Sequence, residues 1–155
     1  MTRVLIVLAG VFASVGVAVA QTPSAPPAAP AMERVEGIGG FFFRAQDPKA
    51  LAQWYADHLG VGATPSEYGQ EAWQQSAGPT AFAPFPAATK YFGGAEQQFM
   101  LNFRVRSLEA MVAQLRRAGI KVDVDPETYP NGLFARLNDP EGNPIQLWQP
   151  VGKPR

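Results

Sequence analysis

The alternation of apolar and polar residues is clearest near the end of the chain, in residues 129–150. Two runs, 133–138 and 145–149, alternate in the manner of strands, and the stretch between them, residues 139–143 (DPEGN), is dense in turn-forming residues. Such a pattern predicts a β-hairpin. The hairpin is the stretch around which we expect the rest of the fold to be organised.

The two faces of the last predicted strand differ in chemistry. Side chains alternate along a strand, so Gln146 and Trp148 are expected on one face and Ile145 and Leu147 on the other. The aliphatic face is suited to a core. The face with Gln146 and Trp148 is suited to lining a cavity.

Helical spacing of apolar residues appears in two segments, 49–59 and 108–118. Their apolar positions are Leu51, Trp54, Tyr55 and Leu59 in the first segment, and Leu108, Met111, Val112 and Leu115 in the second. Asp47 and Ser107 precede the segments as N-caps, and Gly60 and Gly119 follow them as stops. Two helices are therefore predicted.

Further strands are predicted at residues 39–45, 80–85, 98–105 and 120–124. The motif Phe-Arg before a helix occurs twice, at 43–44 and 103–104, with a spacing of 60 residues. The repeat predicts an α+β fold built from two similar strand–helix–strand modules whose sheets combine, with the helices outside.

Composition restricts the function. Lys and Arg total 13 and Asp and Glu total 13, so the chain offers no basic surface for nucleic acid or anionic lipid. There is no cysteine, which excludes disulfides and a lipoprotein anchor. With 155 residues the chain has room for one domain, and a small molecule is the expected partner.

The N-terminus has the pattern of a secretory signal in residues 1–20, with cleavage expected after Ala20. Residues 21–32 form a Pro/Ala-rich linker, and the domain is expected from 33 to 155. The mature protein is therefore expected to be periplasmic or secreted, with no membrane association. An uncleaved membrane anchor is the alternative.

Three motifs together resemble the vicinal oxygen chelate superfamily, which includes glyoxalase I, extradiol dioxygenases and bleomycin-resistance proteins. They are FFFRAQDPKALAQWYADHLG, FRVRSLEAMVAQLRRAG and FARLNDPEGNPIQLWQP, and the resemblance covers about residues 35–150. It implies an α+β fold of two βαβββ modules forming a cupped mixed sheet around a pocket, and commonly a homodimer.

In the metal-using relatives, His or Glu side chains in the cup hold a divalent ion. The resemblance places the corresponding positions at Gly40, Met100 and Gln146, with a further one near Phe82. A glycine, a thioether and an amide offer almost no negative charge to such an ion. Metal-dependent chemistry is therefore not expected, and neither a cofactor nor a catalytic residue is predicted.

Strand parity and the resemblance together suggest which residues line the cup. The candidate ligand-binding residues are Phe42, Arg44, Trp73, Met100, Asn102, Arg104, Phe134, Arg136, Gln146 and Trp148. Each has a structural alternative, such as plain packing for the aromatic rings or an ion pair for the arginines. The lone histidine, His58, and Glu71 are expected to be an ordinary helix residue and a solvated carboxylate.

Three functions remain open from the sequence. The first is a non-metal binding module for a small, partly aromatic molecule. The second is a lyase, isomerase or dioxygenase that holds metal through non-standard residues such as Glu71 or Gln146. The third is an interaction module whose cup is filled by its own side chains.

Overall fold

A computed structural model of the chain describes residues 33–62, 65–67 and 69–152. The predicted signal segment and linker, residues 1–32, lie outside the described residues. The chain divides into two units, Met1–Gly40 and Phe41–Arg155. In the first unit the described residues, 33–40, form neither helix nor strand.

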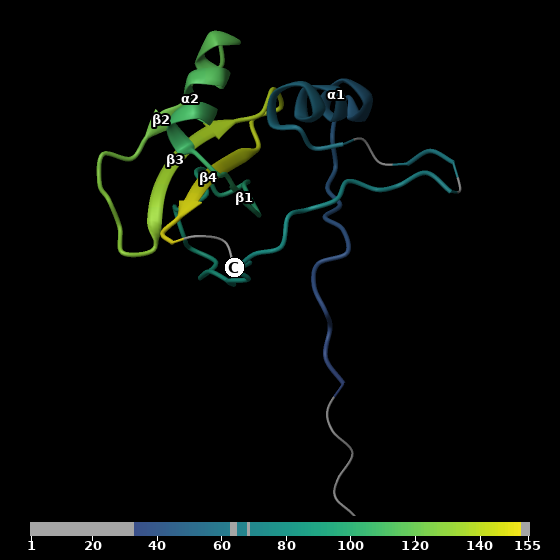
Figure 1. The fold of residues 1–155 in the computed structure, drawn as a ribbon, viewed down its shortest axis with the longest axis horizontal. Coiled ribbons are helices and arrows are strands. Elements are labelled where there is room, and N and C mark those ends of the chain that lie inside the picture. Colours follow the sequence, from purple (N-terminus) through teal and green to yellow (C-terminus); the bar gives the residue numbers. More distant parts are fainter. Residues whose placement is uncertain (1–32, 63–64, 68, 153–155) are drawn as a thin grey trace, which may run out of the picture. The chain divides into compact units, whose positions relative to one another are not determined.

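The second unit contains a four-stranded mixed sheet (Figure 1). Its strands are β1 (Leu101–Arg104), β2 (Asp123–Val124), β3 (Gly132–Asn138) and β4 (Pro144–Pro150), in the order β1-β4-β3-β2. β4 pairs in parallel with β1 and antiparallel with β3, and β3 pairs antiparallel with β2. The predicted hairpin is therefore confirmed, and β4 is a central strand.

Helix α1 (Pro48–Leu59) begins and ends as its sequence predicts. The Asp47 carboxylate accepts a hydrogen bond from the Ala50 N–H at 3.0 Å, and Pro48 occupies the first turn, where a missing N–H costs nothing. The helix ends at Gly60, whose φ of 68° lies in the left-handed region that glycine adopts without strain.

Helix α2 (Leu108–Arg117) follows the same logic. The Ser107 hydroxyl accepts from the Ala110 N–H at 3.2 Å, and Gly119 continues the chain with a φ of 78°. Arg116 and Arg117 lie in the last turn, where cations interact favourably with the helix dipole. In the described residues, no helix has the length and apolar character needed to cross a membrane.

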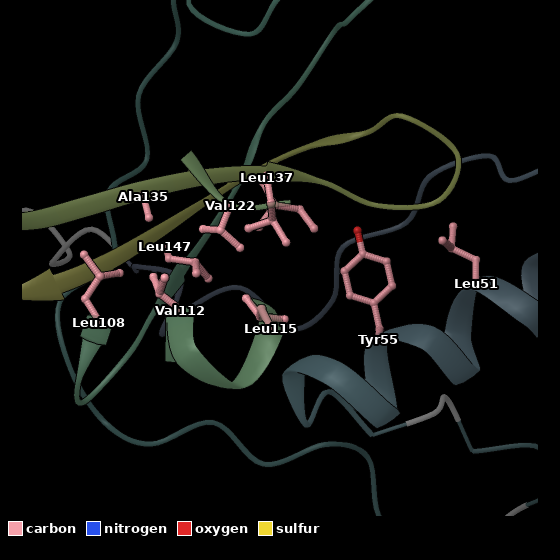
Figure 2. Close-up of a cluster of buried hydrophobic side chains, with 10 residues drawn as sticks. Leu51, Tyr55, Leu108, Val112, Leu115, Val122, Ala135, Leu137 and Leu147 are labelled. Carbon is pink, nitrogen blue, oxygen red and sulfur yellow. The ribbon is translucent and has the colours of Figure 1, made fainter. Parts of the chain in front are cut away.

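The core lies between α2 and one face of the sheet (Figure 2). Buried side chains come from α2, from β3 and β4, from α1, and from the residue directly before β2. They are Leu51, Tyr55, Leu108, Val112, Leu115, Val122, Ala135, Leu137, Ile145 and Leu147. Ile145 and Leu147 have no exposed surface, which confirms that this face of β4 belongs to the core.

The β3–β4 turn joins α1 to the sheet through Asp139, a buried carboxylate. Asp139 accepts the Tyr55 hydroxyl at 2.9 Å, the N–H groups of Glu141 and Asn143 at 2.9 Å each, and the Asn143 side-chain amide at 2.7 Å. Figure 2 shows the Tyr55 hydroxyl directed toward this turn. Four donors stabilise the charged carboxylate in a place where an unsatisfied one would be very costly.

Two further side chains of the hairpin satisfy backbone donors at the helix starts. The Glu141 carboxylate accepts from the N–H groups of Gln46 and Asp47, both at 2.8 Å. The Gln149 side-chain oxygen accepts from the Leu108 N–H at 2.7 Å. The first N–H groups of a helix have no partner within it, so the hairpin supplies partners where the two helices begin.

Some predicted strands are wrong. Residues 39–45 and 80–85 form no strand, and the strands predicted at 98–105 and 120–124 are shorter, at Leu101–Arg104 and Asp123–Val124. A strand requires a hydrogen-bonded neighbour, whereas alternation indicates only which face is apolar. Pro84 and Pro86 also lack the N–H that a ladder needs. The α+β class is confirmed, and in the described residues every strand comes from the second half.

The Tyr55–Asp139 hydrogen bond generates a stability prediction. The substitution Tyr55→Phe should lower the free energy of unfolding by about 1–3 kcal/mol, because it removes a buried hydrogen bond to a charged group. The measurement is urea unfolding at neutral pH. Tyr129→Phe is the matched control, since its hydroxyl bonds the Asp125 carboxylate at 3.1 Å at a more accessible position. Equal losses in the two variants would contradict the assignment.

The same tyrosine predicts how stability changes at alkaline pH. Burial, followed by the charge of Asp139 and the hydrogen bond to it, raises the pKa of Tyr55 far above its ordinary value of 10.0. The folded state keeps this proton at a pH where the unfolded chain has released it, so the free energy of unfolding falls as pH rises above about 10. Urea midpoints between about pH 8 and 11 should fall less steeply in Tyr55→Phe than in wild type. Parallel curves would exclude a contribution from Tyr55.

Candidate functional site

The sheet face opposite the core holds six of the predicted binding residues in two aligned rows. The register places Asn102, Gln146 and Arg136 side by side across β1, β4 and β3, and Arg104, Trp148 and Phe134 in the next row. Strand alternation keeps all six on one face. We call these six residues the sheet-face cluster. Their role in ligand binding stays a prediction, although the structure brings them together.

Gln146 lies at the centre of the first row and is 6% exposed. Its side-chain oxygen accepts from the Asn102 amide at 2.7 Å, and its side-chain nitrogen donates to the Tyr91 hydroxyl at 2.9 Å. A buried amide requires such partners. Tyr91 precedes β1 in the chain, so a residue from outside the sheet also lies against the cluster.

The two arginines of the cluster are held by neutral groups. Arg104 donates from Nη2 to the Ser76 carbonyl at 2.7 Å and from Nη1 to the Ala77 carbonyl at 3.3 Å. Arg136 donates to the Tyr91 carbonyl at 3.2 Å, and its guanidinium carbon lies 4.2 Å from the centre of the Tyr91 ring. The chain between Ser76 and Tyr91 therefore contacts the cluster at both ends.

The second row contains two aromatic rings in parallel. The ring centres of Phe134 and Trp148 are 6.3 Å apart, with an angle of 4° between the ring planes. Tyr129 lies edge-on to Phe134, with 5.7 Å between the centres, and the Trp148 indole N–H donates to the Asn131 carbonyl at 2.8 Å. These contacts fix the ring orientations and leave both rings partly exposed.

Two glycines make room for cluster side chains. A β-carbon at Gly132 would lie 2.7 Å from the Trp148 indole nitrogen and would collide with the Gln149 carbonyl oxygen, and the φ of 140° already favours glycine. A β-carbon at Gly78 would collide with Nη1 of Arg104. Both positions therefore require the absence of a side chain for the cluster to keep its arrangement.

The other four predicted residues do not join the cluster. Phe42 is 90% exposed, and Arg44 is also exposed. Trp73 lies edge-on to Phe103, whose ring is on the helix side of the sheet. Met100 is half-buried and directly precedes β1.

The positions that hold metal in relatives do not fit a divalent cation. Gln146 uses both ends of its amide in hydrogen bonds, and Met100 offers only a thioether. Within residues 33–152, apart from the three that are not described, no group of three or more His, Cys, Asp or Glu side chains is placed to bind a metal. Glu71 is exposed, and His58 packs against the Trp54 ring.

Sequence reasoning missed Tyr91, Gly78 and Gly132. Tyr91 lies outside every predicted element, and its contact with Gln146 joins residues 55 positions apart. The dipeptide Asn131-Gly132 is a known turn signal and could have indicated a special backbone position. Nothing local marks Gly78, because its neighbour Arg104 is distant in sequence.

One four-stranded mixed sheet, with helix α2 packed on one face and a chemically distinct opposite face, defines the class of fold. The strand–helix–three-strand order of β1, α2, β2, β3 and β4 is one βαβββ module. The glyoxalase-like domain family model matches residues 40–148, and the chain therefore belongs to this family. The resemblance to the vicinal oxygen chelate superfamily is confirmed.

Solved structures agree with this assignment. TnmS3, an antibiotic binding protein from Streptomyces sp. CB03234, aligns with a TM-score of 0.51 and 21% identity over 77% of this chain and 100% of that chain. At this identity the similarity shows the fold alone, which is the glyoxalase/bleomycin-resistance fold.

Two other structures align over different shares of the chain. A glyoxalase/bleomycin resistance protein from the same organism is 35% identical over 34% of this chain, with a TM-score of 0.31, and the match spans 46% of that protein. A lactoylglutathione lyase from Agrobacterium tumefaciens is 20% identical over 68% of this chain and 87% of that chain, with a TM-score of 0.44. No curated protein matches the chain at a significant level.

The close approach of β4 residues Trp148 and Gln149 to Gly132 generates a stability prediction. Gly132→Ala should lower the free energy of unfolding by about 2–3 kcal/mol, since it adds a steric clash to an unfavourable φ. Gly142→Ala is the control in the same hairpin: its φ is 87°, but no atom lies within 4 Å of an added β-carbon, so only the backbone cost of about 1–2 kcal/mol is expected. Urea unfolding compares the two. A smaller loss for Gly132→Ala than for Gly142→Ala would contradict the close approach of Gly132 to Trp148 and Gln149.

Proposed function

We propose that this protein binds a small, partly aromatic molecule on the sheet-face cluster without using a metal. The observation that supports this most is the pair of parallel rings, Phe134 and Trp148, which adjoins an amide and two guanidinium groups on the same face. Exposed aromatic surface provides contact area, and fixed polar groups orient a ligand. The name of TnmS3, an antibiotic binding protein of the same fold, agrees with this function.

The polar groups of the cluster retain capacity for a ligand. An Asn side chain has two N–H donors and a carbonyl oxygen, and Asn102 uses one donor toward Gln146. The Asn102 side chain is exposed, whereas Gln146 is buried beside it. Asn102 is therefore the amide that a ligand would reach first, with Gln146 fixing its orientation.

The donor chemistry supports binding over metal-dependent catalysis. A metal-dependent lyase or dioxygenase would need imidazole or carboxylate groups that converge, and the positions of Met100 and Gln146 provide neither. We therefore assign no catalytic residue. Stoichiometric Fe, Mn, Ni or Zn in the purified protein would overturn this assignment.

A second function is favoured by the contacts of the segment before β1. This segment uses some of the hydrogen-bonding groups of the cluster. Arg104 donates to Ser76 and Ala77, and both Arg136 and Gln146 donate to Tyr91. Such contacts are expected if the face is filled by the chain itself. In that case the protein would be an interaction module that contacts a partner through other surfaces. Ligand binding that depends on the cluster distinguishes the two functions.

The proposal includes export and self-association. The signal pattern of residues 1–20 supports a periplasmic or secreted location after cleavage at Ala20, and the family resemblance supports a homodimer. N-terminal sequencing of the protein from its native host tests the cleavage, and sedimentation of the mature chain tests the dimer.

Binding predicts stabilisation by aromatic compounds. In a thermal-shift screen of fused-ring compounds, at least one should stabilise the protein, because a ligand at 100 times its Kd adds about 2.7 kcal/mol. Trp148→Leu should then weaken that ligand about 2- to 10-fold, the effect of losing one aromatic contact. Isothermal titration measures both affinities.

The matched control is Trp54→Leu, because Trp54 lies on α1 against Tyr55 and His58, away from the cluster. It should leave the affinity unchanged. Phe134→Leu provides a second cluster variant if Trp148→Leu is unstable. A screen without any hit, or equal effects of the Trp148 and Trp54 variants, would refute the proposed function.

A further inference from the structure

We infer that the ligand of the sheet-face cluster is an aromatic anion, whose negative group contacts the guanidinium of either Arg104 or Arg136 and is attracted by both. This inference rests on the proposed function and specifies the chemical class of its ligand. It follows from the charges on this face of the sheet, from the way the two guanidinium groups are held, and from their position relative to the rings.

Among the residues that the structure describes, the positive charges of the cluster have no acidic partner. In the part of the chain that the structure describes, the single ion pair joins Lys121 and Asp123, at 3.6 Å. The register places Asp123, on β2, opposite Arg136, on β3. Asp123 forms its ion pair with Lys121 and not with Arg136. No carboxylate of the described residues therefore lies within ion-pair distance of Arg104 or Arg136.

The groups that hold these arginines are neutral. Carbonyl oxygens of Ser76, Ala77 and Tyr91 orient the guanidiniums but bring no formal charge. A guanidinium has five N–H donors, of which Arg104 uses two and Arg136 uses one in these contacts. Donors therefore remain for an anion, and a carboxylate can accept two of them in parallel.

Arg104 is also positioned by packing. The chain at Gly78 approaches its Nη1 so closely that a β-carbon there would collide with it. Arg104 is half-buried, unlike the exposed Arg136. A partly desolvated and oriented guanidinium binds an anion more strongly than a freely moving one, because less side-chain entropy is lost.

The positions of the arginines match those of the rings. Arg104 is the register partner of Trp148, and Arg136 is two residues from Phe134 on the same face of β3. A ligand whose ring lies on the Phe134–Trp148 pair would therefore have a guanidinium on each side. Because the chain as a whole has 13 basic and 13 acidic residues, this preference would be local and would not come from the net charge.

The test compares 2-naphthoate with 2-naphthamide, which have the same ring system and nearly the same shape but differ in charge. Isothermal titration should show about tenfold tighter binding of the naphthoate, the effect of a charged hydrogen bond. The preference should shrink when NaCl is raised from about 0.05 M to about 0.5 M. Arg104→Gln and Arg136→Gln should each reduce it and leave the affinity for naphthamide unchanged.

Two controls separate charge from structure. Arg117→Gln removes an exposed arginine of α2 outside the cluster and should leave the preference intact. Arg104→Lys keeps the charge but loses the paired, oriented donors, so it should retain part of the preference that Arg104→Gln loses. Failure of Arg104→Lys to do better than Arg104→Gln would overturn the role of the charge.

The outcomes distinguish this inference from the proposed function. Equal binding of naphthoate and naphthamide, with loss of both in Trp148→Leu, would overturn the anion inference and leave the aromatic site in place. A naphthoate preference that survives both Arg→Gln substitutions would also overturn it. If neither compound binds, the anion inference falls, and the thermal-shift screen of other aromatic compounds then decides the proposed function by itself.

Discussion

The buried carboxylate of Asp139 is the group on which the arrangement of the second unit depends. It closes the β3–β4 turn through the N–H groups of Glu141 and Asn143, and it accepts the Tyr55 hydroxyl of α1, a residue 84 positions away. Since Asp139 is charged and buried, each of these donors is needed. The turn therefore keeps one geometry, and α1 packs where its tyrosine can reach that turn.

The hairpin also sets the chemistry of the two sheet faces. A shift of one residue in the pairing of β4 would bring Gln146 and Trp148 into the core and expose Ile145 and Leu147. The turn geometry and the core together prevent such a shift, because Ile145 and Leu147 are fully buried. The same interactions that stabilise the core therefore place the six residues of the sheet-face cluster together on the opposite side.

Much of this arrangement could be predicted from local signals. The Asp47 and Ser107 caps, the left-handed glycine at Gly60 and the turn residues after Asn138 each act on their immediate neighbours, and the structure has them as predicted. Parity along β1, β3 and β4 likewise identified all six cluster residues. Contacts between distant segments were not predictable in this way: neither Tyr91 against Gln146 nor Gly78 against Arg104 leaves a local pattern.

The sequence by itself determined the two helices, the closing hairpin and which side chains of each strand share a face, because caps, turns and alternation act over a few residues. Only the tertiary structure decided which apolar runs become strands. Residues 39–45 and 80–85 are rich in apolar residues, as the true strands are, but a strand exists only where another backbone supplies its hydrogen bonds. The position of the partner segments, and with it the environment of each candidate residue, depends on the packing of the whole chain.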